Sequence, residues 1–287
     1  MQRNSRAPGK IILSGEYAVV FGYPGIAIPA NVGVEVQWED TRDAPMKIIL
    51  EGAAGSESYA RKIVDQCITR GGLASGTLTI KNSIPVGRGM GSSTALVIAI
   101  CRCLLGEENR GQALEVENIV NPGNSGLDFA VIWENKPVKF TKGQTPEIID
   151  LPSDLLRNSV LVDTGMPGES TAELVAWMKT RTNEPAITEA FKTIGTCTER
   201  ILAGEDLMTV MRDHHRAQMT LGVVTPEAQT LIAEIEKAGG SAKVLGAGAR
   251  TGGGGMVLGI GSDIDQIRSI AALHAVDFNT SVSARMS

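Results

Sequence analysis

One short segment constrains the fold of this chain more than any other: alternate glycines, two serines and then a long apolar run. This segment, the glycine loop, reads Gly87-Arg-Gly-Met-Gly-Ser-Ser93, and the apolar residues continue to Leu105. The run predicts a buried helix that Gly106 ends. Unpaired backbone N–H groups and the positive end of a helix dipole then meet at the glycines, which suits a polyphosphate. The alternative is an ordinary turn in which Ser92 or Ser93 only caps the helix.

Two other glycine-rich schemes for binding phosphate are not met by this sequence. A Walker A loop needs G-x-x-x-x-G-K-[ST], and no such run occurs in the 287 residues. The nearest match to a Rossmann fingerprint, Gly246-Ala-Gly-Ala-Arg-Thr-Gly252, lies near the C-terminus and leads into a predicted strand. The sequence therefore favours a phosphate loop of another type.

Composition narrows the classes of protein to consider. A chain of 287 residues, 43% of them apolar, is long enough for two lobes and a sizeable core. The formal net charge of −5 argues against nucleic-acid binding, which needs a basic surface. Apolar runs stay well short of the ~18 residues that span a membrane, so we expect no membrane association and a cytoplasmic location. The four cysteines lack metal-site spacing, and we expect them reduced and buried.

The pattern of apolar residues predicts an α+β chain. In the first half, strands are expected at 10–13, 32–38, 46–50 and 77–80, and helices at 57–70, 93–105 and 112–120. Residues Phe129–Phe140 are expected to be rich in strand. The second half begins with a strand at Ser159–Asp163 and is then mostly helical, with strands on both sides of the glycine run Gly252–Gly255 and a last strand at Thr280–Arg285. We expect two lobes that divide near residue 160.

Three separated segments together resemble the signature motifs of the GHMP kinases, the superfamily of galactokinase, homoserine kinase, mevalonate kinase and phosphomevalonate kinase. In chain order they are Ala7-Pro-Gly-Lys-Ile-Ile-Leu-Ser-Gly-Glu-Tyr-Ala-Val-Val20, the glycine loop with its flanks (Pro85–Ala95), and Lys243-Val-Leu-Gly-Ala-Gly248. Within the superfamily the chain looks most like the mevalonate kinases. Two further segments of this chain, Asp163-Thr-Gly and Ser170-Thr-Ala-Glu-Leu-Val, also resemble segments of that family. The resemblance covers nearly the whole chain.

The resemblance implies the two-lobed α+β fold of the GHMP kinases. Residues 1–160 would form an N-terminal lobe like ribosomal protein S5 domain 2, residues 161–287 an α+β C-terminal lobe, and the site would lie between them. The implied activity is transfer of the γ-phosphoryl group of ATP, with Mg²⁺, to the hydroxyl of mevalonate in isoprenoid precursor synthesis. The implied partner is a small-molecule substrate, and a homodimer is possible because dimers are common in the family.

The resemblance also assigns catalytic roles. Glu117 and Asp128 have the spacing of a mevalonate kinase segment, and Ser125-Gly-Leu-Asp128 matches its end. Asp128 is the expected general base, although Ser125-x-x-Asp128 is also a capping-box pattern in which the carboxylate only bonds a backbone N–H. Lys10 matches the family lysine beside the transferred phosphate, where a fixed cation stabilises developing charge. The alternative for Lys10 is a surface lysine at a strand edge.

Binding residues follow from the same motifs. The nucleotide would bind at Gly87, Gly89, Gly91, Ser92, Ser93 and Thr94. Glu117 would hold Mg²⁺ together with Ser92 or Ser93, because this cation prefers oxygen ligands and usually takes one or two from protein. The alternative for Glu117 is a solvated helix residue. The acceptor would contact Glu16, Tyr17, Ser170, Thr171, Gly246, Ala247 and Gly248.

Three departures from the mevalonate kinase pattern leave the acceptor open. Tyr17 stands where that family usually has histidine, and Asn121-Pro-Gly-Asn stands where it often has His-Gly-x-Pro. Ala249–Thr251 separates the third motif from the glycine run, so Arg250 could lie in solvent or reach an anionic group. The alternatives are therefore another GHMP kinase, acting on phosphomevalonate or homoserine, or a non-catalytic small-molecule sensor on the same fold.

One histidine pair suggests a metal site but lacks the rest of the pattern. His214 and His215 follow Asp213, and adjacent residues on a helix point in different directions. A third ligand with suitable spacing is absent from the sequence. We therefore expect the pair to be solvated or to cap a helix.

Overall fold

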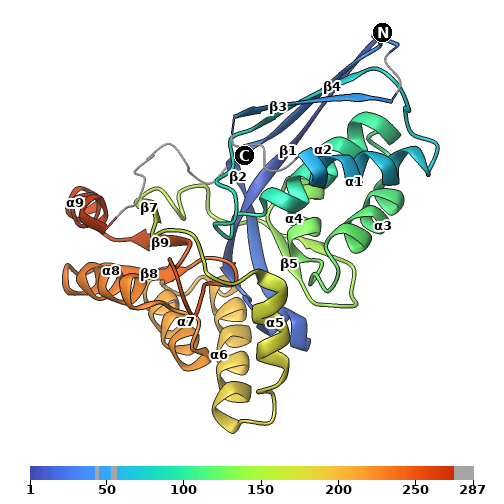
Figure 1. Ribbon diagram of the computed structural model, residues 1–287. Coiled ribbons are helices and arrows are strands. Elements are labelled where there is room, and N and C mark those ends of the chain that lie inside the picture. The colour runs from blue at the N-terminus through green and yellow to red at the C-terminus, as the bar shows by residue number, and fades with distance from the viewer. Residues whose placement is uncertain (43–44, 53–56, 275–287) are drawn as a thin grey trace.

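Two β-sheets organise the part of the chain that the structure, a computed structural model, describes: residues 1–42, 45–52 and 57–274 (Figure 1). The first sheet is built on a long antiparallel pair, β1 (Gln2–Ser14) and β2 (Gly25–Glu39). The other edge of β2 pairs with β4 (Thr77–Asn82) and, nearer its start, with β5 (Val138–Phe140). The sheet ends in β3 (Lys47–Gly52), which runs parallel to β4, and in β6 (Glu147–Ile148), which pairs with β5.

Four helices form a layer beside the first sheet: α1 (Glu57–Ile68), α2 (Ser92–Leu105), α3 (Arg110–Val120) and α4 (Leu127–Glu134) (Figure 1). Helix α2 contacts β1 and β2 and is flanked by the other three helices. Its residues are buried almost all round, as expected for a helix without a polar face. The predicted helix after the glycine loop is therefore confirmed, and its residues from Thr94 onward anchor it in the core.

The strand-rich segment expected over Phe129–Phe140 is wrong for most of its length. Helix α4 covers its first part, and only β5 is a strand. Short apolar runs do not distinguish a buried strand from a buried helix, and here the run packs against β1 and β2 as a helix. Phe129 and Trp133 stack one helical turn apart, with ring centroids 5.7 Å from each other.

The second sheet is smaller and antiparallel, in the order β7 (Ser159–Asp163), β9 (Met256–Ile260) and β8 (Ser241–Val244). Helices α7 (Leu207–Leu221), α8 (Pro226–Lys237) and α9 (Ile264–His274) pack against it. Helix α6 (Pro185–Leu202) pairs with α7 and also contacts β1, and α5 (Thr171–Lys179) lies beside α6 in Figure 1. None of the helices in the described ranges is both long and apolar enough to cross a membrane. The last predicted strand, Thr280–Arg285, lies outside the described residues.

The two halves of the chain share buried apolar surface. One core cluster joins residues of β1, β2 and α2 to Met211 on α7 and to Leu258 and Ile260 on β9. A second cluster lies between the small sheet and α8, and a third joins α5, α6 and α7 to Tyr17 and Ala18. The predicted lobe boundary at residue 160 falls inside β7, and the division into two lobes stays a prediction.

Candidate active site

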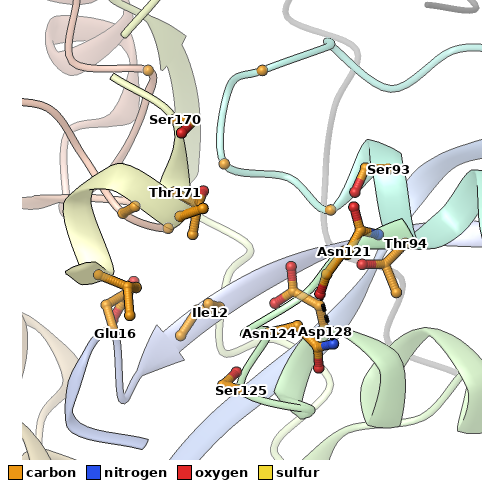
Figure 2. Close-up of a pocket in the computed structure, with 18 of the residues that line it drawn as sticks. Ile12, Glu16, Ser93, Thr94, Asn121, Asn124, Ser125, Asp128, Ser170 and Thr171 are labelled. Carbon is orange, nitrogen blue, oxygen red and sulfur yellow. Dashed lines mark hydrogen bonds between the residues drawn. The ribbon is translucent and has the colours of Figure 1, made fainter. Parts of the chain in front are cut away.

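A pocket of about 690 Å³ opens where the glycine loop, the residues after β1 and the start of α5 meet. Every residue that the sequence predicts for catalysis or for binding lines this pocket. In Figure 2, Glu16, Ser170 and Thr171 lie on one side, Ser93, Thr94 and Asn121 lie on the other, and Asp128 lies between them. The motifs thus come together from distant parts of the sequence, since Tyr17 and Ala247 are 230 positions apart, although their roles stay proposals.

The glycine loop has the backbone conformation that only glycine adopts easily. Gly87, Gly89 and Gly91 have φ angles of 71°, 79° and 77°, in the left-handed region. Gly91 is the N-cap of α2, and no side chain among the described residues caps the helix. The alternative of a serine cap is therefore wrong. The first N–H groups of α2 lack intrahelical acceptors and face the pocket with the positive end of the helix dipole.

The glycine loop and the third motif touch backbone to backbone. A Cβ on Gly89 would lie 2.6 Å from the carbonyl oxygen of Leu245, and a Cβ on Gly246 would lie 2.8 Å from the Cα of Gly89. Arg88 adds a second link, since its Nε lies 2.7 Å from Oδ1 of Asp163 on β7. These contacts fix the distance between the two sheets at the pocket.

Lys10 reaches the pocket through an irregularity in β1. The β1–β2 register shifts between Pro8 and Lys10, and the Lys10 N–H donates to the Met90 carbonyl at 3.0 Å. Bulges of this kind redirect side chains. Gly91 leaves room for the lysine, because a Cβ there would lie 2.9 Å from Lys10 Cγ. The side chain is only 3% exposed and its Nζ lies 3.3 Å from Asp128 Oδ1, so the alternative of a surface lysine is wrong.

Asp128 is free of the capping role that its spacing also allowed. The N-cap of α4 is Gly126, which makes no side-chain capping bond, and the Ser125 hydroxyl accepts from the Leu127 N–H at 3.2 Å. The capping box therefore does not form. The Asp128 carboxylate is 34% exposed, pairs with Lys10 and lines the pocket.

Glu117 is buried on α3, and the alternative of a solvated glutamate is wrong. Its residue exposure is 1%. Oε1 accepts from the Thr94 hydroxyl at 2.7 Å, and Oε2 accepts from Asn121 Nδ2 at 2.9 Å. The Tyr59 hydroxyl donates to Asn121 Oδ1 at 2.8 Å, which holds the amide in place. Burial raises the pKa of Glu117 to about 7 against these hydrogen bonds, and the nearby Asp128 adds to the rise.

This oxygen-rich corner suits a divalent cation bound together with phosphates. Among the described residues, no group of three or more His, Cys, Asp or Glu side chains could hold a metal alone. Mg²⁺ typically takes one or two carboxylates and completes its shell with water and phosphate oxygens. Glu117 matches that need, because a cation beside it would favour the ionised carboxylate that burial disfavours.

On the acceptor side, several predicted contacts already have partners. Ser170 caps α5 in a capping box with Glu173, and its hydroxyl donates to Glu173 Oε2 at 2.7 Å. The Tyr17 hydroxyl donates to the Ala247 carbonyl at 2.6 Å. Tyr17 also has a φ of 62°, a strained conformation for a bulky residue. Burial, followed by the charges of Glu169 and Glu16, raises the pKa of Tyr17, so it stays protonated and tied to the third motif.

The inserted residues Ala249–Thr251 are ordered by contacts beside the pocket. The Glu169 carboxylate accepts from the backbone N–H groups of Arg250 and Thr251, at 3.1 and 3.3 Å. The Arg250 guanidinium lies over the Trp177 ring, 4.3 Å from its centroid, and is not among the residues that line the pocket. Of the two alternatives, the exposed position is the one observed.

The expectation for the histidine pair is wrong, because both residues are buried. Met211, His214, Gln218 and Leu221 share the buried face of α7, at helical spacing. His214 Nε2 lies 3.0 Å from Glu16 Oε2, and Lys243 Nζ forms an ion pair with Glu16 Oε1. Burial and the Lys243 charge lower the pKa of His214. The apolar periodicity around His214 was the signal that could have revealed its burial.

Comparisons with known proteins identify the family of this chain. Residues 58–133 match the model of the GHMP kinases N terminal domain. A mevalonate kinase of Thermococcus gammatolerans is 30% identical over an alignment of 300 positions. The alignment covers 87% of this chain and 86% of that kinase. This chain belongs to the GHMP kinase family. A mevalonate kinase of Archaeoglobus fulgidus is 27% identical to this GHMP kinase. Their alignment covers 88% of this chain and 90% of the Archaeoglobus kinase.

Solved structures share the fold of this GHMP kinase over nearly its full length. The Methanococcus jannaschii mevalonate kinase has a TM-score of 0.78 at 20% identity and covers 95% of this chain and 94% of its own. The Lactococcus lactis galactokinase, complexed with galactose, has a TM-score of 0.75 at 16% identity and covers 99% and 92%. The predicted α+β GHMP kinase fold is therefore confirmed. At these identities the likeness shows the fold alone.

Proposed function

We propose that this GHMP kinase, an ATP-dependent small-molecule kinase, transfers the γ-phosphoryl group of ATP to the hydroxyl of mevalonate. The observation that carries the proposal is the Lys10–Asp128 pair at 3.3 Å, between the glycine loop and the acceptor side of the pocket. The curated relatives described above, at 27% and 30% identity, are both named mevalonate kinase. They support the choice of acceptor.

The pair suits phosphoryl transfer to an alcohol. The reaction needs a group to accept or orient the hydroxyl proton and a cation to stabilise the charge that develops on the phosphoryl oxygens. The Asp128 carboxylate would accept the proton, since it has no capping bond to hold it elsewhere. Lys10 would stabilise the charge, because its buried Nζ is fixed by Asp128 on one side of the pocket.

The nucleotide phosphates would lie on the glycine loop. Gly87, Gly89 and Gly91 allow close approach of the backbone, and the first turn of α2 offers N–H donors and a positive dipole. Glu117, with Ser92 or Ser93, would hold Mg²⁺, which supplies positive charge to the phosphates when bound. The Thr94 hydroxyl would act through Glu117, to which it donates.

Charge favours mevalonate over a phosphorylated acceptor. Among the described residues that line the pocket, the cationic side chains are Lys10 and Arg88. Each already faces a carboxylate, Asp128 or Asp163. A doubly charged phosphate on the acceptor would need a further cation, whereas a single carboxylate can be held by the N-terminus of α5 at Ser170 and Thr171. A homodimer stays a prediction.

An ADP-release assay with a panel of acceptors tests the proposal. Purified protein would receive MgATP with mevalonate, phosphomevalonate, homoserine or galactose, and kcat/KM would be compared. We expect the highest value with mevalonate. A higher value with another alcohol would replace the proposed acceptor, and binding of an acceptor without ADP release would favour a sensor.

A further inference from the structure

A buried group of charged and polar side chains lies beneath the acceptor side of the pocket. Glu16 follows β1, Lys243 is in the middle of β8 and His214 is on α7, and all three are buried. Lys243 Nζ pairs with Glu16 Oε1 and donates to the Ile12 carbonyl at 3.1 Å. Of the three, only Glu16 lines the pocket. We call these three residues the Glu16 cluster.

The second oxygen of Glu16 keeps capacity to accept a hydrogen bond. His214 Nε2 lies 3.0 Å from Oε2, but neither atom has a partner with hydrogen-bond geometry among the described residues. Buried polar atoms in native proteins are nearly always hydrogen-bonded, so each exception needs an explanation. A ligand hydroxyl in the pocket would supply the missing donor to Oε2.

Stability does not explain why the chain keeps these charges. Removing two charges from water costs free energy that their attraction only partly returns. Replacing both members of a buried pair by neutral residues of similar volume is often neutral or stabilising, whereas removing one member is strongly destabilising. A fully buried pair whose anion lines a pocket is therefore better explained by a ligand than by packing.

We propose that Lys243 and His214 are positioning residues, which hold the Glu16 carboxylate in one orientation so that its Oε2 accepts a hydrogen bond from a hydroxyl of the acceptor. The inference rests on the proposed function in that the pocket takes an alcohol, and on the acceptor contact of Glu16 that the family resemblance implies. Lys243 fixes Oε1 through the ion pair, and His214, whose Nε2 lies 3.0 Å from Oε2, limits rotation of the carboxylate. Neither residue touches the acceptor, since neither lines the pocket.

A double variant separates positioning from packing. Lys243→Met alone leaves a buried carboxylate without its cation and should lower the melting temperature strongly. Glu16→Gln/Lys243→Met removes both charges at similar volume and should restore it. We expect the double variant to bind a non-hydrolysable ATP analogue as wild type does, within about twofold, but to bind the acceptor about 10- to 100-fold more weakly, the usual range for a lost charged hydrogen bond. Acceptor binding would be measured by calorimetry with the analogue present, so the readout does not need turnover.

A surface ion pair provides the matched control. Glu189 and Lys192 on α6 lie 3.9 Å apart and are 69% and 65% exposed. Glu189→Gln/Lys192→Met should change neither affinity. His214→Leu should weaken acceptor binding several-fold, and His214→Gln, which keeps a polar group beside Glu16, should weaken it less.

Wild-type acceptor affinity in the folded Glu16→Gln/Lys243→Met variant would overturn the inference, since the charges would then serve packing alone. Equal loss of acceptor and nucleotide affinity would overturn it as well, because that result indicates a general distortion of the pocket. Wild-type binding of an alcohol other than mevalonate would contradict the proposed acceptor, and the variants would then be compared with that alcohol. Failure of wild-type protein to bind any of the four acceptors would overturn both proposals.

Discussion

Replacing Asp128 by asparagine separates catalysis from packing at the centre of the pocket. The substitution keeps the size of the side chain and one oxygen near Lys10, but it removes the negative charge 3.3 Å from the lysine Nζ. Because Lys10 is only 3% exposed, it loses a charged partner that water does not fully replace. We expect a stability loss of about 1–3 kcal/mol, at the lower end because the amide oxygen still accepts.

The expected effect on turnover is larger than the effect on stability. An amide cannot accept the proton of the acceptor hydroxyl, and general bases typically contribute ~10²–10⁴-fold in rate. That range corresponds to about 2.7–5.4 kcal/mol in the activation barrier. We expect kcat in the ADP-release assay to fall by at least about a hundredfold. Nucleotide protection in thermal unfolding should be retained, since Asp128 is not part of the glycine loop.

Asp265→Asn on α9 is the control for this prediction. Asp265 also pairs with a cation, Arg268, at 3.2 Å, but its side chain is 86% exposed and does not line the pocket. Its substitution should leave turnover unchanged and stability within about 0.5 kcal/mol. Near-normal turnover in a folded Asp128→Asn variant would refute the role of general base. The reaction would then depend on Lys10 and the metal.

Three further predictions test the nucleotide side of the pocket. Wild-type protein should gain about 2.7 kcal/mol of stability at MgATP concentrations ~100 times the dissociation constant, and no rise in melting temperature at millimolar MgATP or MgADP would contradict the proposed nucleotide site. The raised pKa of Glu117 means that ionisation costs the folded state more than the unfolded one. In metal-free protein the free energy of unfolding should therefore fall by roughly 3 kcal/mol as the pH rises from 4.5 to 7. Glu117→Gln should remove that fall when unfolding is measured as a function of pH. Gly89→Ala should cost at least about 2 kcal/mol and abolish MgATP protection, since its Cβ would clash with Leu245, whereas Gly143→Ala, with similar φ and open space, should cost about 1 kcal/mol and keep that protection.

The sequence predicts well what depends on short spacings. The glycine loop, the helix after it and the ordered motifs were all readable, because alternate glycines favour close approach of the backbone and an all-round apolar helix must be buried. The capping ambiguity at Asp128 could not be resolved from spacing. It depended on the backbone at Gly126, which has a φ of 94° and is the N-cap of α4 in place of Ser125.

Local patterns in the sequence do not predict individual contacts between distant segments. The Lys10–Asp128 pair joins residues 118 positions apart, and the Glu16–Lys243 pair joins residues 227 positions apart. Local propensity contains no information on either pair. In α4, tertiary packing against β1 and β2 overrode the strand preference of the β-branched residues Val131 and Ile132. His214 is buried despite its polar side chain, because it lies at helical spacing from apolar residues such as Met211 and Leu221.

The rigid contacts around the pocket favour catalysis by positioning. In phosphoryl transfer the protein contributes mainly orientation and electrostatic stabilisation, so the phosphates and the acceptor must be held at a fixed separation. Here the glycine loop belongs to the first half of the chain, whereas α5 and the third motif belong to the second. The Gly89–Gly246 backbone contact joins them at the closest point, and the Arg88–Asp163 ion pair adds a second link. Substitutions at that junction should therefore lower kcat through misalignment even where every catalytic group is intact.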